Sequence, residues 1–194
     1  DIVLSSIALV CFSPIFWVVF ILSRFGENKG PLFYKQVRIG WHGKPFKIYK
    51  FRSMVVNADT ILENDPELYA KYVANNYKLE PEEDPRITRL GRWLRKTSID
   101  EIPQFLNILH GEMSIIGPRP IVKAELAEYG DRVDKLLSVK PGAMGLWQSS
   151  GRSNIPYPKR CDVELEYVDK ASLKFDTEIM FKNIISIFKS DGAY

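Results

Sequence analysis

The chain has 194 residues, of which 45% are hydrophobic and 26% charged, and its formal net charge at pH 7 is +3. This length is sufficient for one domain with a hydrophobic core, and the composition is that of a globular protein. Two histidines and two distant cysteines, Cys11 and Cys161, without a C-x-x-C motif, argue against a zinc site and against a disulfide.

The first segment of the chain is apolar. No charged residue occurs from Ile2 to Ser23, and the residues that follow are strongly basic. The basic residues up to position 52 are Arg24, Lys29, Lys35, Arg38, Lys44, Lys47, Lys50 and Arg52, against the single acidic Glu27. An uncharged segment with a basic flank is typical of a membrane helix whose flank faces the cytoplasm. Because the sequence begins at Asp1 without Met, we expect a piece of a longer protein, and a cleaved signal peptide is disfavoured.

A Ser13-Pro14 pair interrupts this apolar run. Proline removes a helical hydrogen bond, and a serine hydroxyl can satisfy a backbone group that is freed in this way. The run is long enough for a kinked transmembrane helix, since about 20 helical residues span a ~30 Å hydrocarbon layer. It equally fits a re-entrant helix whose two arms, of roughly 10 residues each, enter and leave on one side. The residues alone leave both readings open.

Further along the chain, periodicity and turn residues predict a helix-rich α/β fold with a small β-sheet or hairpin. A hairpin is expected from the two segments that flank Gly40-Trp41-His42-Gly43. Helices are expected over 58–78 with a break near Pro66, 87–96, 101–111, 122–130, 157–172 and 174–189. Residues 79–86 and the glycine-rich 140–154 are expected to be loops, and 113–120 an apolar stretch ending in Gly-Pro-Arg-Pro.

The last helix, 174–189, has an amphipathic pattern. Its apolar residues recur at near-helical spacing and are Phe175, Ile179, Ile184, Ile187 and Phe188. Such a stripe more often packs into a core, but beside a membrane segment it also fits a helix at the lipid interface.

Residues 95–119 contain the densest set of charged residues that could take part in catalysis. Ser98-Ile99-Asp100-Glu101 fits a capping box. Pro103 argues against that reading, because a proline is favourable only in the first helical turn. A helix starting at about 100–102 would place Asp100 at a helix mouth, which favours anions such as phosphate.

An acidic pair among basic groups suits phosphoryl chemistry. A carboxylate can attack phosphorus to form an acyl-phosphate, and a second carboxylate can hold Mg²⁺ or handle a proton. Arg95 and Arg119 could supply positive charge at the transition state. The alternative for Arg119 is an ordinary surface arginine, although its place between two prolines favours a fixed ligand.

Other patterns support weaker alternatives. The basic and aromatic residues of 35–52 fit a solvated strand, or a non-catalytic membrane adaptor that binds anionic lipid or nucleic acid. The segment GLWQSSGRS could hold a phosphate or nucleoside, but one glycine-rich loop is a nonspecific signal. A glycosidase is disfavoured because adjacent carboxylates on a helix point about 100° apart.

Together these motifs resemble a known family. The resemblance rests on the apolar segment with Ser13-Pro14, GPLFYKQVRIGWHGKPFKIYKFRSM, DPRITRLGRWLRKTSIDEIPQFLNILHGEMSIIGPRP and KPGAMGLWQSSGR, in this order. The chain is similar throughout its length to the bacterial sugar transferases, the monotopic polyprenol-phosphate phosphoglycosyl transferases. KTSIDEIPQ, IIGPRPIV and the closing DGAY are most similar to the undecaprenyl-phosphate galactose-phosphate transferase branch.

This resemblance implies transfer of a sugar-1-phosphate, glucose or galactose, from a UDP-sugar to undecaprenyl phosphate, with release of UMP and use of Mg²⁺. Such a reaction would be the first membrane step of O-antigen, capsule or exopolysaccharide synthesis. The resemblance makes Asp100 the nucleophile and Glu101 its partner, both as Mg²⁺ ligands. The further residues that it places in or around the site are Lys50, Arg95, Arg119, Arg152 and Asp176.

The resemblance also implies an organisation at the membrane. Residues 1–23 would form a re-entrant helix bent at Ser13-Pro14, and 24–194 a catalytic domain on the cytoplasmic face of the bacterial inner membrane. Amphipathic helices would lie at the lipid interface. We expect no nucleic-acid partner; a homodimer is compatible with the sequence, which leaves the oligomeric state open.

Overall fold

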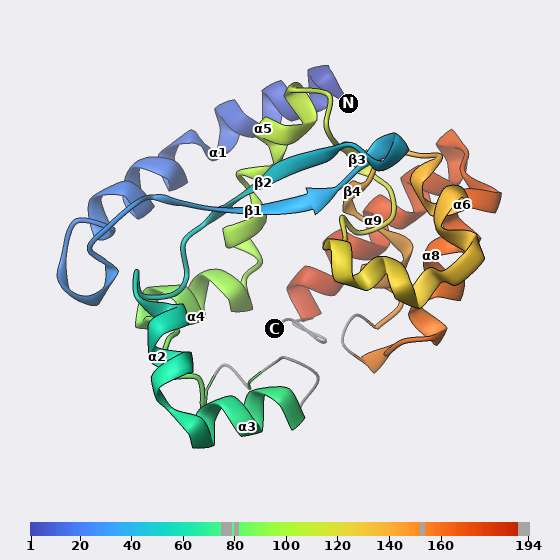
Figure 1. Cartoon of the computed structure of the whole chain (residues 1–194). Helices are drawn as coiled ribbons and strands as arrows, with labels where there is room; N and C mark the ends of the chain where they lie inside the picture. Colours follow the sequence, from blue (N-terminus) through green and yellow to red (C-terminus); the bar gives the residue numbers. More distant parts are fainter. Residues whose placement is uncertain (75–78, 80–81, 152–153, 190–194) are drawn as a thin grey trace.

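The structure is a computed structural model that describes residues 1–74, 79, 82–151 and 154–189. Figure 1 shows a central hairpin, β1 (Phe33–Ile39) and β2 (Pro45–Phe51), with helices on either side of it. On one side lie α1 (Ile2–Leu22), α2 (Ala58–Asn64), α3 (Pro66–Ala74), α4 (Arg89–Lys96) and α5 (Gln104–Leu109). On the other lie α6 (Val133–Leu137), α7 (Leu146–Ser149), α8 (Lys159–Lys170) and α9 (Leu173–Lys189). The expected helix-rich fold with a small amount of sheet is confirmed.

The apolar segment forms one helix, α1, that continues through Pro14. Pro14 cannot donate a hydrogen bond to the carbonyl of Val10, and the hydroxyl of Ser13 donates to that oxygen instead, at 2.8 Å. Among the described residues α1 is the one helix long and apolar enough to cross a membrane. The structure contains no membrane, so the re-entrant arrangement stays a prediction.

α1 contacts the rest of the protein at both of its ends. Near its C-terminal end, Val19 is buried in a cluster with Phe51 and Leu94, and Phe16 stacks edge-on against Phe51. At its start, the carboxylate of Asp1 accepts hydrogen bonds from the hydroxyl of Ser114 and from a backbone N–H of β3 (Ser114–Ile116). The helix therefore lies along the domain instead of leaving it.

The predicted hairpin is confirmed, and it is tied to α5 by one buried side chain. β1 and β2 pair antiparallel, and residues 41–43 form a 3-10 turn between them. Asn107 of α5 is fully buried; its amide nitrogen donates to the carbonyl of Lys47 at 2.8 Å and its oxygen accepts from the N–H of Tyr49 at 2.9 Å. Asn107 thus pairs with β2 as a neighbouring strand would, and it fixes α5 against the hairpin.

The helices expected at 58–78 and 87–96 are present as α2, α3 and α4, with the break at Pro66. Residues 75–78, the end of the helical segment predicted over 58–78, lie outside the described residues. The N-terminus of α4 is capped by Thr88, whose hydroxyl accepts from the N–H of Gly91 at 2.9 Å. Glu27 also accepts from the N–H of Arg89 at 2.7 Å.

Near the acidic pair, the expected helix start was too early. Residues 99–101 form a single 3-10 turn, and α5 begins only at Gln104. Ser98 adopts a left-handed conformation with φ of 56° and makes no side-chain cap, so the capping-box reading is wrong. The left-handed Ser98 and the 3-10 turn follow the end of α4, and Pro103 takes the N-cap position of α5, where its missing N–H removes no helical hydrogen bond.

The glycine-rich segment 140–154 was expected to be a loop, and that expectation is wrong for part of it. Residues 142–144 form a strand, β4 (Gly142–Met144), which pairs parallel with β3, and α7 follows at once. The approach requires glycine, since a Cβ on Gly142 would lie 2.1 Å from the nitrogen of Gly117. The glycines of this segment predicted a loop, but in the structure they permit close contact between backbone segments.

The last two predicted helices are confirmed as α8 and α9, and 122–130 forms a 3-10 helix (Lys123–Arg132) rather than an α-helix. In α9, Phe175 and Ile179 pack in the core, as expected of the apolar stripe, whereas Ile184 is exposed. The side chains of Ile187 and Phe188 lie outside the description. A second stripe is exposed instead and consists of Leu173, Phe181, Ile184 and Ile185.

Candidate active site

The acidic pair lies on the 3-10 turn Ile99–Glu101, in contact with β2. Asp100 is buried, with 8% of its surface exposed, and Glu101 is partly exposed. The left-handed turn at Ser98 and the contact of α5 with β2 together place the pair beside the end of the hairpin. A buried carboxylate next to a second carboxylate is energetically unfavourable, because it loses hydration and is repelled by a like charge, so it needs nearby positive charge.

That charge comes first from Lys50, near the end of β2. The ammonium nitrogen of Lys50 lies 2.5 Å from Oε1 of Glu101. The pKa of Asp100 is raised to about 6: burial raises it most, Lys50 and Arg95 lower it, and the charge of Glu101 adds to the rise. A carboxylate with such a pKa is largely ionised at neutral pH and remains basic enough to act as a nucleophile.

The second cation is Arg95, in the last turn of α4. Its Nε donates to the hydroxyl of Ser53 at 2.8 Å. Burial lowers the pKa of Arg95, and the nearby Asp100 counteracts this. Asp100, Glu101, Lys50 and Arg95 thus form one cluster, as the sequence predicted, although the roles assigned to them stay predictions.

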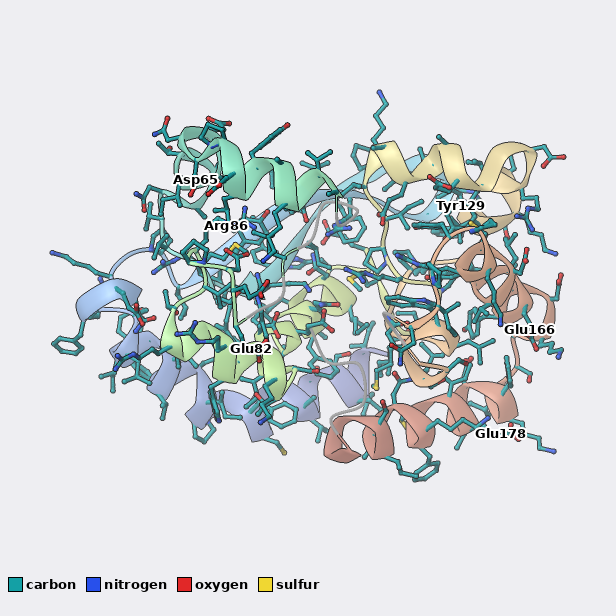
Figure 2. All side chains as sticks on the ribbon, turned by 90° about the horizontal axis from the view of Figure 1, so that it is seen from below. Asp65, Glu82, Arg86, Tyr129, Glu166 and Glu178 are labelled. Atoms are coloured by element: carbon teal, nitrogen blue, oxygen red, sulfur yellow. The ribbon has the colours of Figure 1, made fainter. Side chains whose placement is uncertain are left out.

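The sequence reasoning missed a buried ion pair beside this cluster. Arg86 donates to both carboxylate oxygens of Asp84 at 2.8 Å, and its backbone N–H also donates to Asp84. Figure 2 shows Arg86 between the α2–α3 segment and α4. Both residues were part of an expected polar loop; the signal that could have found them is the Asp-Pro-Arg sequence itself, which places opposite charges two residues apart.

Arg119 lies in a different cluster. Its backbone N–H donates to Glu164 at 2.7 Å, and its guanidinium lies 5.4 Å from the ring centre of Trp147. Arg160 lies 4.3 Å from the same ring and pairs with Glu164, which is 1% exposed. Burial raises the pKa of Glu164, and Arg160 counteracts this. Arg119 thus contacts Glu164 and Trp147, which Arg160 also contacts.

Of the other two predicted site residues, the structure describes Asp176 alone. Asp176, on the first turn of α9, accepts a hydrogen bond from the hydroxyl of Tyr167 at 2.9 Å. Arg152 lies outside the described residues.

The acidic pair has the donor chemistry that Mg²⁺ requires. Mg²⁺ binds through one or two carboxylates and keeps water and substrate phosphates as its other ligands. Within the described residues no group of three or more acidic, histidine or cysteine side chains is available. Asp100 and Glu101 therefore fit a site that is completed by a substrate, and they do not fit an all-protein cage.

The sequence is similar to known proteins along almost its whole length. Residues 1–190 match the family described as bacterial sugar transferase. Over the full chain, identity is 44% to the undecaprenyl-phosphate galactose phosphotransferase of Salmonella typhimurium, covering 40% of that protein. It is 42% to the exopolysaccharide production protein ExoY of Rhizobium meliloti, covering 86% of it.

Over the full chain, identity is 36% to the UDP-glucose:undecaprenyl-phosphate glucose-1-phosphate transferase of Escherichia coli, covering 40% of that protein. The chain therefore spans about two fifths of the length of several of its relatives. The family match nevertheless covers both the apolar helix and the cluster around Asp100, and the protein belongs to the bacterial sugar transferase family.

Proposed function

We propose that the protein transfers a sugar-1-phosphate from a UDP-sugar to undecaprenyl phosphate, through a covalent intermediate on Asp100. The observation that carries this proposal is the buried carboxylate of Asp100, flanked by Glu101 and by the cations Lys50 and Arg95. The names of the relatives support the two substrate classes. With 44% identity to a protein named for galactose and 36% to one named for glucose, galactose is the sugar we favour.

In the first step an oxygen of the Asp100 carboxylate attacks the phosphorus that carries the sugar. A new O–P bond forms, and the bond between this phosphorus and the oxygen of UMP breaks, so that UMP leaves with the electron pair. In the second step a phosphate oxygen of undecaprenyl phosphate attacks the same phosphorus. The acyl-phosphate bond breaks, Asp100 is restored as a carboxylate, and the sugar is linked to the lipid through a diphosphate.

The cations next to Asp100 have a defined part in this scheme. Negative charge accumulates on the oxygens of the transferred phosphate, and the guanidinium of Arg95 can stabilise it. Lys50 neutralises Glu101, which otherwise raises the pKa of the nucleophile. Held by Asp100 and Glu101, Mg²⁺ would supply further positive charge to these oxygens.

The protein is proposed to act at the cytoplasmic face of the bacterial inner membrane. The outer face of α1 exposes large apolar side chains, including Val3, Val10 and Trp17, each 67–73% exposed. In Figure 2, α1 and α9 lie along the same edge of the molecule, and α9 exposes Leu173 and Phe181. Two apolar helices on one edge suit a surface that lies in lipid.

The contacts of α1 favour a re-entrant rather than a spanning helix. A helix that crosses the bilayer leaves the domain behind at one end, whereas α1 contacts the domain near Val19 and again at Asp1. Residues 1–23 are accordingly proposed as a membrane element with both ends on the cytoplasmic side, and 24–194 as the catalytic domain.

Incubation with a UDP-sugar alone tests the covalent step. The protein should release one equivalent of UMP and gain the mass of a sugar phosphate on a peptide that contains Asp100. Asp100→Asn should show neither change, and Asp162→Asn, which alters an exposed carboxylate paired with Arg132, serves as the matched control. A wild-type protein without an adduct, or an active Asp100→Asn variant, would overturn the proposal. A panel of UDP-sugars in the same assay identifies the sugar.

A further inference from the structure

Ser53 lies two residues after the end of β2 and is held closely against α4. Its backbone carbonyl accepts the N–H of Thr88 at 3.1 Å, and its surface is 8% exposed. A Cβ on Gly91 would come within 1.8 Å of that carbonyl oxygen, so only glycine permits this approach. The first turn of α4 is therefore fixed against residue 53.

The close packing of Gly91 against the backbone of Ser53 brings Arg95 to the Ser53 hydroxyl. Arg95 follows Gly91 by four residues, so both lie on the same face of α4. The Nε of Arg95 donates to Oγ of Ser53 at 2.8 Å, which is a well-formed hydrogen bond. This bond uses one edge of the guanidinium and holds the plane of the group in one orientation.

Two carboxylates act on Arg95, Asp100 more strongly and Asp84 less, and Asp84 does not compete for a hydrogen bond with it. Asp84 is occupied by three hydrogen bonds from Arg86, two from its guanidinium and one from its backbone. Within the described residues, the hydrogen-bond partner of the Arg95 guanidinium is thus a neutral hydroxyl. A hydroxyl orients the cation without neutralising it, whereas a carboxylate in the same place would do both.

We propose that Ser53 is a positioning residue for the reaction: it holds Arg95 by its Nε edge, so that the remaining N–H groups and the full charge face the phosphate that Asp100 attacks. This inference rests on the proposed function, because it takes Asp100 as the nucleophile. It assigns no contact with substrate to Ser53 itself. The effect of Ser53 is expected on the rate of the first step and not on the affinity for the UDP-sugar, since a charged group fixed in advance acts mainly on the transition state.

The test measures single-turnover UMP release and the UDP-sugar concentration at half-maximal rate, in the full chain in detergent or nanodiscs. Ser53→Ala should slow UMP release about tenfold or more, the usual consequence of losing a hydrogen bond to a charged group. The half-maximal concentration should change less than about twofold. Ser53→Thr keeps the hydroxyl and should restore most of the rate, whereas Ser53→Cys, similar in size but a weak acceptor, should resemble Ser53→Ala.

The control is Ser138→Ala, which removes an exposed hydroxyl bonded only to a carbonyl of its own helix end. Three results would overturn the inference: an unchanged rate in Ser53→Ala, a loss confined to UDP-sugar affinity, or equal losses in Ser53→Ala and Ser53→Thr at unchanged melting temperature. These results leave the proposed function intact as long as wild type forms the Asp100 adduct. Absence of the wild-type adduct refutes the function itself, so the two failures are distinguishable.

Discussion

The ammonium nitrogen of Lys50 lies 2.5 Å from Oε1 of Glu101, and the two residues come from segments that are 51 positions apart. This contact joins the end of the hairpin to the turn that carries the acidic pair. It also means that the basic stretch 35–52 does not face solvent uniformly: Arg38 pairs with Glu125, and Arg52 donates to backbone carbonyls.

Removal of the Lys50 charge should slow the first chemical step. In Lys50→Gln the pKa of Asp100 should rise, because Lys50 is the largest influence that lowers it. We expect single-turnover UMP release at pH 7 to fall about 100-fold, the lower end of the loss seen when one charge-stabilising donor is removed. The rate should recover in part at higher pH. Lys47→Gln, an exposed lysine of the same strand, is the control, and an equal loss in both variants would contradict the prediction.

Asp100→Asn should abolish activity and stabilise the fold at alkaline pH. Folding raises the pKa of Asp100 from 3.8 to about 6, so the folded state resists ionisation of this group. The ionisation of Asp100 therefore lowers the free energy of unfolding; this effect is absent below about pH 4 and complete above about pH 6. Melting curves with EDTA should show a Tm higher by about 2–4 °C in Asp100→Asn at pH 8, and no difference near pH 4. A Tm of Asp100→Asn below that of wild type at pH 8 would show that attraction by the nearby cations stabilises the Asp100 carboxylate more than burial destabilises it.

Gly91→Ala should damage both the fold and the site. The added Cβ would meet the carbonyl of Ser53 at 1.8 Å and force α4 away from the hairpin. Overpacking of this kind costs about 1–3 kcal/mol, and the accompanying shift of Arg95 should lower the rate of UMP release. Urea denaturation and the UMP assay measure the two effects. Lys96→Ala, exposed on the same helix, should change neither.

Glu164→Ala should destabilise the second cluster. Glu164 is 1% exposed and accepts from the Nε of Arg160 and the N–H of Arg119. Its removal leaves the buried Arg160 with the longer ion pair to Glu125, at 3.6 Å, and takes the acceptor from the Arg119 N–H. Breaking a buried pair in this way costs about 3–5 kcal/mol of unfolding free energy. Glu166→Ala on the same helix removes an exposed carboxylate that pairs with Lys170, and it should cost less than about 1 kcal/mol. Similar losses for both would argue against this account.

The topology of α1 is open to a direct test. A cysteine inserted immediately before Asp1, in a Cys11→Ser background, should react with a membrane-impermeant maleimide only after the inner membrane is opened. Lys29→Cys in the basic flank should behave in the same way, because both ends of α1 contact one domain. Labelling of the inserted cysteine alone in intact cells from the periplasmic side would show that α1 spans the bilayer.

Much of the local structure was predictable because it depends on residues close in sequence. The hairpin follows from alternation around a glycine-containing turn, and the break between α2 and α3 from Pro66. Expectations failed where a distant partner decides the backbone. Gly142 belongs to a strand only because Gly117 lets it approach, and Ser98 turns left-handed because α4 and α5 are each held to the hairpin.

In the candidate site, too, some features could be predicted from the sequence and others could not. Asp100 and Glu101 are adjacent, so their sequence alone determined that two carboxylates lie together, and the motifs around them determined the family. The resemblance also placed Lys50, Arg95 and Arg119 at the site, but only the tertiary structure decided their contacts. Lys50 pairs with Glu101, Arg95 donates to Ser53, and Arg119 lies beside Trp147. The physical reason is that charge and burial act through space, and the neighbours that set them are chosen by packing between α4, α5 and β2.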